Sequence, residues 1–409
     1  MENKIGIFSF FSGAGFLDLG FENSGDYKVL FVNEVHSPFV DIYRHSRKQM
    51  GIKEPKFGYH IDDIQGYLNG KLNILKNYYS EAKTKHDIVG FIGGPPCPDF
   101  SVGGKNRGKE GDNGKLSGTY IELICNIKPD FFLFENVKGL WRTKKHRQFY
   151  EGLKEKLIRN GYLLTERLIN SIEYGVPQDR DRIILIGFKK EFLKINNYKL
   201  NGSPYLWNFN WNKGMVFDKE KIFSLPWIET EPFKENSKKK EPKNIPIELT
   251  VEHWFKKNDV FKHPNGNMFF KPKAGLPKFQ SIVEGDVSKK SYKRLHRWRF
   301  SPTAAYGNNE VHLHPYKARR LSVSEALAIQ SLPKEFEMPE KITLSNAFKA
   351  IGNGVPYLAA KGLGVTILNF IGEFVPNTKY KSNGEINSTK FSILYKPTTK
   401  TEQLSVLEP

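Results

Sequence analysis

The amino-acid sequence predicts an α/β fold, in which a mostly parallel sheet is covered by helices, together with a second, smaller domain. Over residues 1–189, short runs rich in Ile, Val and Phe alternate with amphipathic stretches, which is the order of elements in a parallel sheet with helical crossovers. From residue 190 to residue 299, Lys, Asn and Pro become frequent and the periodicity fades. This change favours a separate, irregular domain.

Each expected element follows from a local pattern. Strands are expected over residues 5–11, 28–32, 88–92, 131–134 and 182–188, and helices over 120–127 and 149–158. In "SVSEALAIQSLP" (322–333), Ser322 and Glu325 have the spacing of a capping box, and Pro333 closes the segment, so a helix is expected there. Residues 377–409 have the composition of a weakly ordered tail, in which "KFSILY" is a candidate edge strand.

The charge of the chain predicts its partners. It has 63 Lys and Arg against 44 Asp and Glu, a formal charge of +19, which favours nucleic acid first and an anionic membrane second. We expect no apolar run near the roughly 20 residues that span a bilayer, and the N-terminus lacks the features of a targeting sequence. Two cysteines make no disulfide framework, and no Cys/His spacing fits a metal site. A soluble, cytoplasmic chain without metal is therefore expected.

A cofactor pocket is predicted at the ends of the first strands. In "SGAGFLDLGFE" (12–22), Gly13 and Gly15 form a turn that lets a ligand approach the backbone, but Asp18 stands where the dinucleotide fingerprint needs a third glycine. A dehydrogenase is therefore disfavoured. Glu34 ends the second strand and is placed to accept ribose hydroxyls, and Asp63 is placed to accept an adenine amino group. Each feature alone is typical of an ordinary turn or strand end; together they favour an adenosine cofactor without a diphosphate, such as S-adenosylmethionine.

A second group of residues indicates chemistry. Cys97 lies in the glycine-flanked loop "GFIGGPPCPDFSVGG" (90–104), and Glu135 ends an apolar strand, where a carboxyl can hold or share a proton. Arg180 and Arg182 begin the last expected strand, so they reach the same edge of the sheet only if that strand runs antiparallel. Singly, these residues have plain roles in packing, capping or surface charge, as we expect for Cys125. Their conjunction favours a reactive site.

At these residues the sequence resembles the DNA cytosine-5 methyltransferase family of bacterial restriction-modification type. Six segments resemble its motifs in the family's order, across about residues 1–190 and 300–365. They are "FFSGAGFLDLGFE", "GGPPCPDFS", "FENV", "QDRDR", "RRLSVSEALAIQSLP" and "AIGNGVPYLAAKGLG" (350–364).

The resemblance implies a Rossmann-like, S-adenosylmethionine-dependent methyltransferase fold with a smaller, irregular target-recognition domain. Residues 1–189 would form the catalytic and cofactor-binding domain and residues 190–299 the target-recognition domain. Residues 300–376 would return to complete the catalytic domain before the tail at 377–409.

Three positions depart from the family's usual pattern. Pro98 follows Cys97 where glutamine is common, Phe16 stands where the cofactor loop usually has a second glycine, and Ser9 stands where an aspartate often opens that loop. The first departure leaves the thiol in place and concerns the detail of the nucleophile loop. The other two put individual cofactor contacts in question.

The resemblance also implies roles for individual residues. Cys97 would attack C6 of a cytosine flipped out of the duplex, Glu135 would bind or protonate N3, and Arg182 and Arg180 would hold O2. The methyl group would come from S-adenosylmethionine. The residues implied for cofactor binding are Phe11, Gly13, Gly15, Glu34, Asp63, Pro95, Leu116, Asn353 and Val355.

The expected substrate is double-stranded DNA. Basic and aromatic residues interleave in "WFKKNDVFKH" (254–263) and "SYKRLHRWRF" (291–300), where contacts to phosphates, and from an arginine to guanine, are expected. Gly103, Gly104 and Gly108 suggest a loop that closes over the base. We expect the protein to be a monomer. We also expect a partner restriction endonuclease that acts on the same DNA site. The alternatives are a cytosine methyltransferase acting on RNA and a catalytically silent DNA-binding protein.

Overall fold

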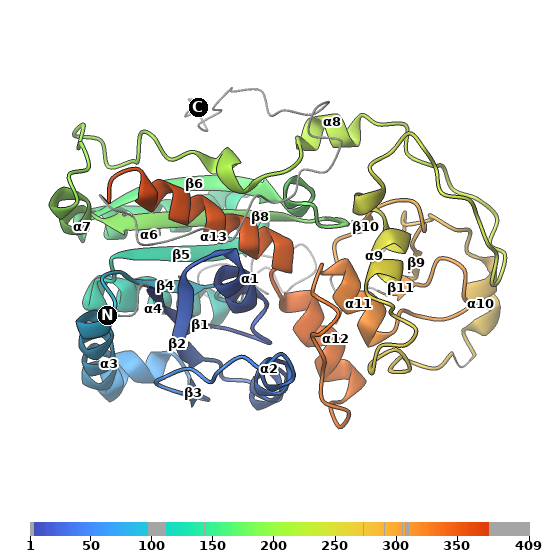
Figure 1. Ribbon diagram of the computed structural model, residues 1–409, viewed down its shortest axis with the longest axis horizontal. Coiled ribbons are helices and arrows are strands. Elements are labelled where there is room, and N and C mark those ends of the chain that lie inside the picture. Colours follow the sequence, from blue (N-terminus) through green and yellow to red (C-terminus); the bar gives the residue numbers. More distant parts are fainter. Residues whose placement is uncertain are drawn as a thin grey trace.

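The computed structural model describes residues 4–96 and 112–375, apart from 143, 273, 290, 305 and 307–310. At its centre is a seven-stranded sheet with the order β3-β2-β1-β4-β5-β8-β6 (Figure 1). Its strands are β1 (Ile5–Phe10), β2 (Tyr27–Asn33), β3 (Tyr59–His60), β4 (Val89–Gly93), β5 (Phe131–Val137), β6 (Tyr162–Asn170) and β8 (Asp181–Lys189). All five expected strands are present, and the predicted α/β fold is confirmed. Only β8 opposes its neighbours, because it pairs antiparallel with β5 and β6.

Helices cover both faces of this sheet. On one face lie α1 (Phe16–Ser24) and α13 (Tyr357–Gly372), whose apolar residues share a core with β1, β2, β5 and β8. On the other face lie α3 (Leu72–Lys85), α4 (Asp112–Ile127) and α6 (Lys144–Arg159). Gly20 of α1 allows the close approach of α13, because a Cβ at Gly20 would lie 2.4 Å from the Cβ of Ala360. A helix near residue 360 is thus built into the first core.

One expectation about the apolar runs is wrong. Within the described part of the chain, residues Leu344–Gly372 have the length and hydropathy of a membrane span. They are divided into α12 (Leu344–Asn353) and α13, and 72% of the apolar window is buried inside the protein. The run is apolar because α13 packs on the sheet beside α1, and α12 packs in a second core with residues of α2, α9 and α11.

The second, smaller lobe lies at the right of Figure 1 and has little regular structure. The short helices on this side are α8 (Lys219–Phe223), α9 (Val251–Lys257), α10 (Leu276–Ser281) and α11 (Val323–Ile329). Elsewhere in the described chain lie α2 (Ser37–Gln49), α5 (Gly139–Arg142) and α7 (Lys190–Ile195). Two-residue strands form two further pairs, β7 (Gln178–Asp179) with β10 (Ser301–Pro302) and β9 (Lys293–Arg294) with β11 (His312–Leu313). Single 3-10 turns span Ser171–Tyr174, Trp211–Gly214 and Ile247–Leu249, and a π-helical turn spans Tyr67–Lys71. Helix α11 begins with the predicted capping box, in which Ser322 and Glu325 exchange hydrogen bonds.

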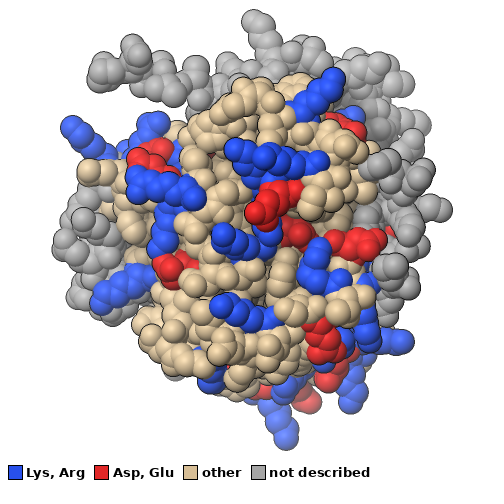
Figure 2. Space-filling model, turned by 90° about the vertical axis from the view of Figure 1, so that its left-hand side faces the viewer, with Lys and Arg blue, Asp and Glu red and all other residues tan. Residues whose placement is uncertain are grey.

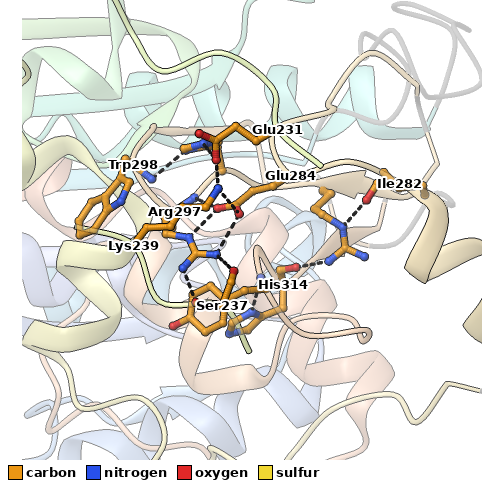
Figure 3. A network of polar contacts seen from close by, with 11 residues as sticks. Glu231, Ser237, Lys239, Ile282, Glu284, Arg297, Trp298 and His314 are labelled. Atoms are coloured by element: carbon orange, nitrogen blue, oxygen red, sulfur yellow. Dashed lines mark hydrogen bonds and ion pairs between the residues drawn. The ribbon is translucent and has the colours of Figure 1, made fainter. Parts of the chain in front are cut away.

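Two buried arginines hold the loops of this lobe together (Figure 3). Arg297 forms a bidentate pair with Glu284, at 2.8 and 2.9 Å, and donates to the carbonyl oxygen and the hydroxyl of Ser237. Arg294 donates to four carbonyl oxygens, including that of Ile282 at 2.8 Å. The expectation that the 291–300 stretch contacts DNA is therefore wrong for these two residues. Loops without a sheet must satisfy their buried carbonyl groups elsewhere, and the guanidinium groups do this.

Candidate active site

A cavity of about 1080 Å³ opens at the carboxyl ends of β1, β2, β4 and β5. The strand order reverses between β1 and β4, which is where open α/β sheets bind ligands. The cavity brings together eight of the nine residues implied for cofactor binding and three of the four implied for catalysis. They are Phe11, Gly13, Glu34, Asp63, Pro95, Leu116, Asn353 and Val355, with Glu135, Arg180 and Arg182. Cys97, Pro98 and the glycines at 103, 104 and 108 lie outside the described residues, as does "KFSILY".

The glycine loop after β1 has the backbone that its sequence requires. Phe11, Gly13 and Gly15 all have positive φ, of 51°, 56° and 81°, a conformation that favours glycine. Gly15 does not line the cavity. A Cβ at Gly15 would lie 2.5 Å from the ring of Tyr43, so Gly15 lets the loop rest on α2 and shapes the site from behind.

Glu34 is fixed against this loop. Its Oε2 accepts a hydrogen bond from the Gly13 amide and its Oε1 one from the His36 amide, both at 2.9 Å. Burial raises the pKa of Glu34, and these backbone donors oppose the rise. Because each carboxylate oxygen can accept more than one hydrogen bond, Glu34 can still accept from hydroxyl groups in the cavity. The carboxylate of Asp63, by contrast, accepts from the Gln65 amide at 2.9 Å.

The two departures in the cofactor loop have structural explanations. The hydroxyl of Ser9 donates to Asp18 at 2.7 Å, and the hydroxyl of Tyr43 donates to the other carboxylate oxygen at 2.7 Å. A carboxylate therefore does lie beneath the loop, supplied by α1 instead of β1. The ring of Phe16 fills the space beside Gly354, where a Cβ would lie 2.2 Å from it. Phe16 thus packs the glycine loop against residues 300–376, the segment that returns to the first domain.

Glu135 and Arg182 form the reactive end of the cavity. Nε of Arg182 lies 2.8 Å from Oε1 of Glu135, because the antiparallel register of β8 on β5 brings the start of one strand to the end of the other. The sequence required this strand to run antiparallel if Arg180 and Arg182 were to reach the same edge of the sheet as Glu135, and β8 does so. The loop that follows β4 is pressed against the same carboxylate, since a Cβ at Gly94 would lie 2.7 Å from Oε2 of Glu135.

Arg180 has a different set of partners. Its guanidinium donates to the carbonyl oxygens of Ala304 at 3.3 Å, Gly352 at 3.0 Å and Gly354 at 3.1 Å, and its side chain is 1% exposed. These bonds join the corner between β7 and β8 to the returning segment. Arg182, which also donates to the carbonyl oxygen of Asp181 at 2.7 Å, is therefore the arginine that lies beside Glu135 in the cavity.

We expect Arg180→Met to lower the free energy of unfolding by about 3 kcal/mol, because three carbonyl groups lose a donor, and that of Ala304 is buried. Urea denaturation followed by circular dichroism measures this. Arg320→Met is the matched control, because Arg320 also lines the cavity but lies over the ring of Phe270; a change below about 1 kcal/mol is expected there. Equal losses in the two variants would contradict the structural role of Arg180.

Several cavity residues carried no sequence signal. Tyr306 and His312 form part of the wall on the side of the smaller lobe, and the Tyr306 hydroxyl lies 3.3 Å from Nδ1 of His312. Burial lowers the pKa of His312 to about 3, so its ring is neutral. Tyr306 lies in a turn and His312 in the two-residue strand β11, and neither belongs to a recognisable motif, which is why their position could not be inferred.

Comparison with known proteins agrees with this geometry. Residues 5–369 match the family model of the C-5 cytosine-specific DNA methylases. The chain is 55% identical over 379 residues to the Type II methyltransferase M.NmeDI of Neisseria meningitidis serogroup C, covering 92% of this chain and 87% of that protein. It is 29% identical over 371 residues to the Type II methyltransferase M.FnuDI of Fusobacterium nucleatum, covering 88% and 94%.

The fold is also that of solved structures. A DNA modification methyltransferase encoded in an Escherichia coli prophage superposes with a TM-score of 0.59 at 23% identity, covering 90% of this chain and 100% of that chain. A variant of the Spodoptera frugiperda protein DNMT2 gives 0.54 at 17%, covering 89% and 100%. The matched family model spans the sheet, the cavity and the returning helices, and the chain therefore belongs to the C-5 cytosine-specific DNA methylases, as an enzyme of the Type II restriction-modification class.

Proposed function

We propose that this DNA cytosine-5 methyltransferase binds S-adenosylmethionine against its glycine loop and a flipped-out cytosine against Glu135 and Arg182. The carrying observation is the 2.8 Å pair between Arg182 and Glu135, in the same cavity as the glycine loop and Glu34. A volume of about 1080 Å³ is at the upper end for small-molecule sites. It therefore leaves room for two occupants.

The residues present fit the proposed cofactor. Glu34 is held in place by two amides and keeps free acceptor capacity, as binding the two hydroxyls of a ribose requires. Phe11, Leu116 and Val355 offer apolar surface, and Asn353 approaches from the returning segment. S-adenosylmethionine, when bound, supplies the methyl group, and the protein orients it with these groups.

In the proposed mechanism the side chains act on the cytosine. The thiolate of Cys97 attacks C6, which makes C5 nucleophilic. Glu135 donates a hydrogen bond or proton to N3, and Arg182 both fixes Glu135 and binds O2, so that the developing negative charge is dispersed. After C5 has been methylated, a base removes the C5 proton and Cys97 leaves. We assign Arg180 a positioning role instead of the base-holding role implied by the resemblance.

Residues 190–299 are proposed as the target-recognition domain, with 300–376 completing the catalytic domain. The former hold 23 of the Lys and Arg residues but only 12 of the Asp and Glu residues, which suits a phosphate backbone. Figure 2 views the opposite end of the molecule from this lobe; there the basic side chains lie among acidic ones without forming a continuous basic area. We therefore propose that the basic surface that contacts DNA lies on the side of the smaller lobe.

Expression in a host without cytosine methylation, followed by bisulfite sequencing, tests the proposal. We expect protected cytosines at one short recurring sequence, which also identifies the recognition site. A parallel assay of tritiated methyl transfer should show transfer to duplex DNA and not to tRNA. Transfer confined to tRNA would support the RNA alternative, and no transfer to either, with DNA binding intact, would support the silent DNA-binding protein.

Further proposals concern the setting of the enzyme. We propose a cytoplasmic monomer and a partner restriction endonuclease that cuts the same unmethylated sequence. Challenge of the bisulfite-mapped site with endonucleases of that specificity tests the protection.

A further inference from the structure

A fully buried carboxylate beneath the glycine loop has no cation in contact with it among the residues that the structure describes. Asp18 accepts hydrogen bonds from two neutral hydroxyls, those of Ser9 and Tyr43. The nearby Arg47 is already paired with Glu22, at 2.6 Å, and lies over the ring of Tyr43. Within residues 4–96 and the described part of 112–375, the negative charge of Asp18 is therefore not neutralised by a salt bridge.

A buried, unneutralised carboxylate of this kind does not help the protein to fold. Burial raises the pKa of Asp18 from 3.8 to about 6, although both hydroxyls and Arg47 oppose the rise. A carboxyl whose pKa is raised stabilises the fold below its unfolded pKa and loses that contribution as the pH rises through the folded value. At pH 7.5 Asp18 is mostly ionised, and the fold carries the cost of a buried charge.

Asp18 lies close behind the proposed cofactor site. It is the third residue of α1, and its two predecessors in that helix, Phe16 and Leu17, line the cavity, as do Ser12, Gly13 and Ala14 of the loop. Its carboxylate thus lies in the first turn of the helix, behind the loop, where little water screens it.

We propose that Asp18 is an electrostatic positioning residue, which holds the loop through Ser9 and Tyr43 and makes the cavity prefer a cationic methyl donor to its neutral thioether product. The inference rests on the proposed function. S-adenosylmethionine carries a sulfonium charge that S-adenosylhomocysteine lacks, and a charge in the protein interior acts over several ångströms because the effective dielectric constant is low. Product release is favoured for the same reason.

Titration calorimetry of the ligand-free protein with each compound tests this. We expect Asp18→Asn, which keeps the shape and one acceptor, to weaken S-adenosylmethionine binding about tenfold and S-adenosylhomocysteine binding less than about twofold. Tyr43→Phe removes one hydrogen bond and keeps the charge, so it should affect both compounds alike. Asp41→Asn, an exposed carboxylate of the same helix as Tyr43, is the control and should change neither.

Two further measurements separate charge from structure. The thermal midpoint of the ligand-free Asp18→Asn variant should equal or exceed that of the wild type, because a buried charge is removed. The exchange Ser9→Asp with Asp18→Ser, which returns the carboxylate to β1, should restore the preference that Asp18→Ser alone loses.

The outcomes are distinguishable. Failure of the wild type to bind either compound would contradict the proposed function itself. Wild-type binding combined with equal weakening of both compounds by Asp18→Asn, or with no weakening, would overturn the role of Asp18 and leave the proposed function intact.

Discussion

Replacement of Cys97 by serine is expected to reduce methyl transfer to less than roughly one-thousandth of the wild-type rate, because a hydroxyl at neutral pH is a far weaker nucleophile than a thiolate. Binding of duplex DNA should be largely retained, since the change removes a reacting atom and no phosphate contact. Tritiated methyl transfer and gel retardation measure the two properties. Near-normal turnover by this variant would refute the covalent mechanism.

The second cysteine provides the control. Cys125 is buried in α4, and burial raises the pKa of its thiol to about 11, so it remains protonated and unreactive. Cys125→Ser should therefore keep the wild-type rate. With DNA that contains 5-fluorocytosine and the methyl donor, the wild type and Cys125→Ser should form a covalent adduct, whereas Cys97→Ser should not.

Replacement of Glu135 by glutamine is expected to lower kcat by about 10²- to 10⁴-fold, the usual contribution of a general acid–base group. Glutamine has the same shape and still accepts a hydrogen bond from Arg182, but it can no longer deliver a proton to N3. Single-turnover measurements at saturating DNA and methyl donor isolate this step from binding.

The matched control is Glu166→Gln. Glu166 lies in β6 of the same sheet and pairs with Tyr150 and Lys154, away from the cavity. It should change stability but not kcat. A Glu135→Gln variant within about threefold of the wild-type kcat would mean that Glu135 only orients the base and that protonation comes from elsewhere.

The sequence predicted those parts of the fold that depend on local patterns. Continuous apolar runs located the buried strands, and the capping box located the start of α11, because both signals lie within a few residues. Strand β6, "YLLTERLIN", escaped because it is an edge strand whose Glu166 and Arg167 bind partners outside the sheet. Helix α13 was not predicted because its glycines weaken a helical pattern. Gly364, for example, allows α13 to pack closely against Ser24.

The candidate site divides in the same way. Glu34 and Glu135 could be inferred because parallel strands end at a common edge. The role of Arg180 could not, because its partners lie more than 120 residues further along the chain and are backbone carbonyls, which carry no sequence signal. The bond from Ser9 to Asp18 was hidden for another reason: each residue, considered alone, departs from a familiar motif, and only the folded turn shows that one compensates for the other.

The packing of α13 on α1 also has a consequence for biosynthesis. The cavity needs Asn353 and Val355 for its wall, and α1 beside the glycine loop is covered by residues up to Gly372. A ribosome must therefore deliver nearly all of the described chain before the pocket exists. Prematurely terminated chains would lack both the pocket and the cover of the first core, so that competence for catalysis is acquired late in synthesis and all at once.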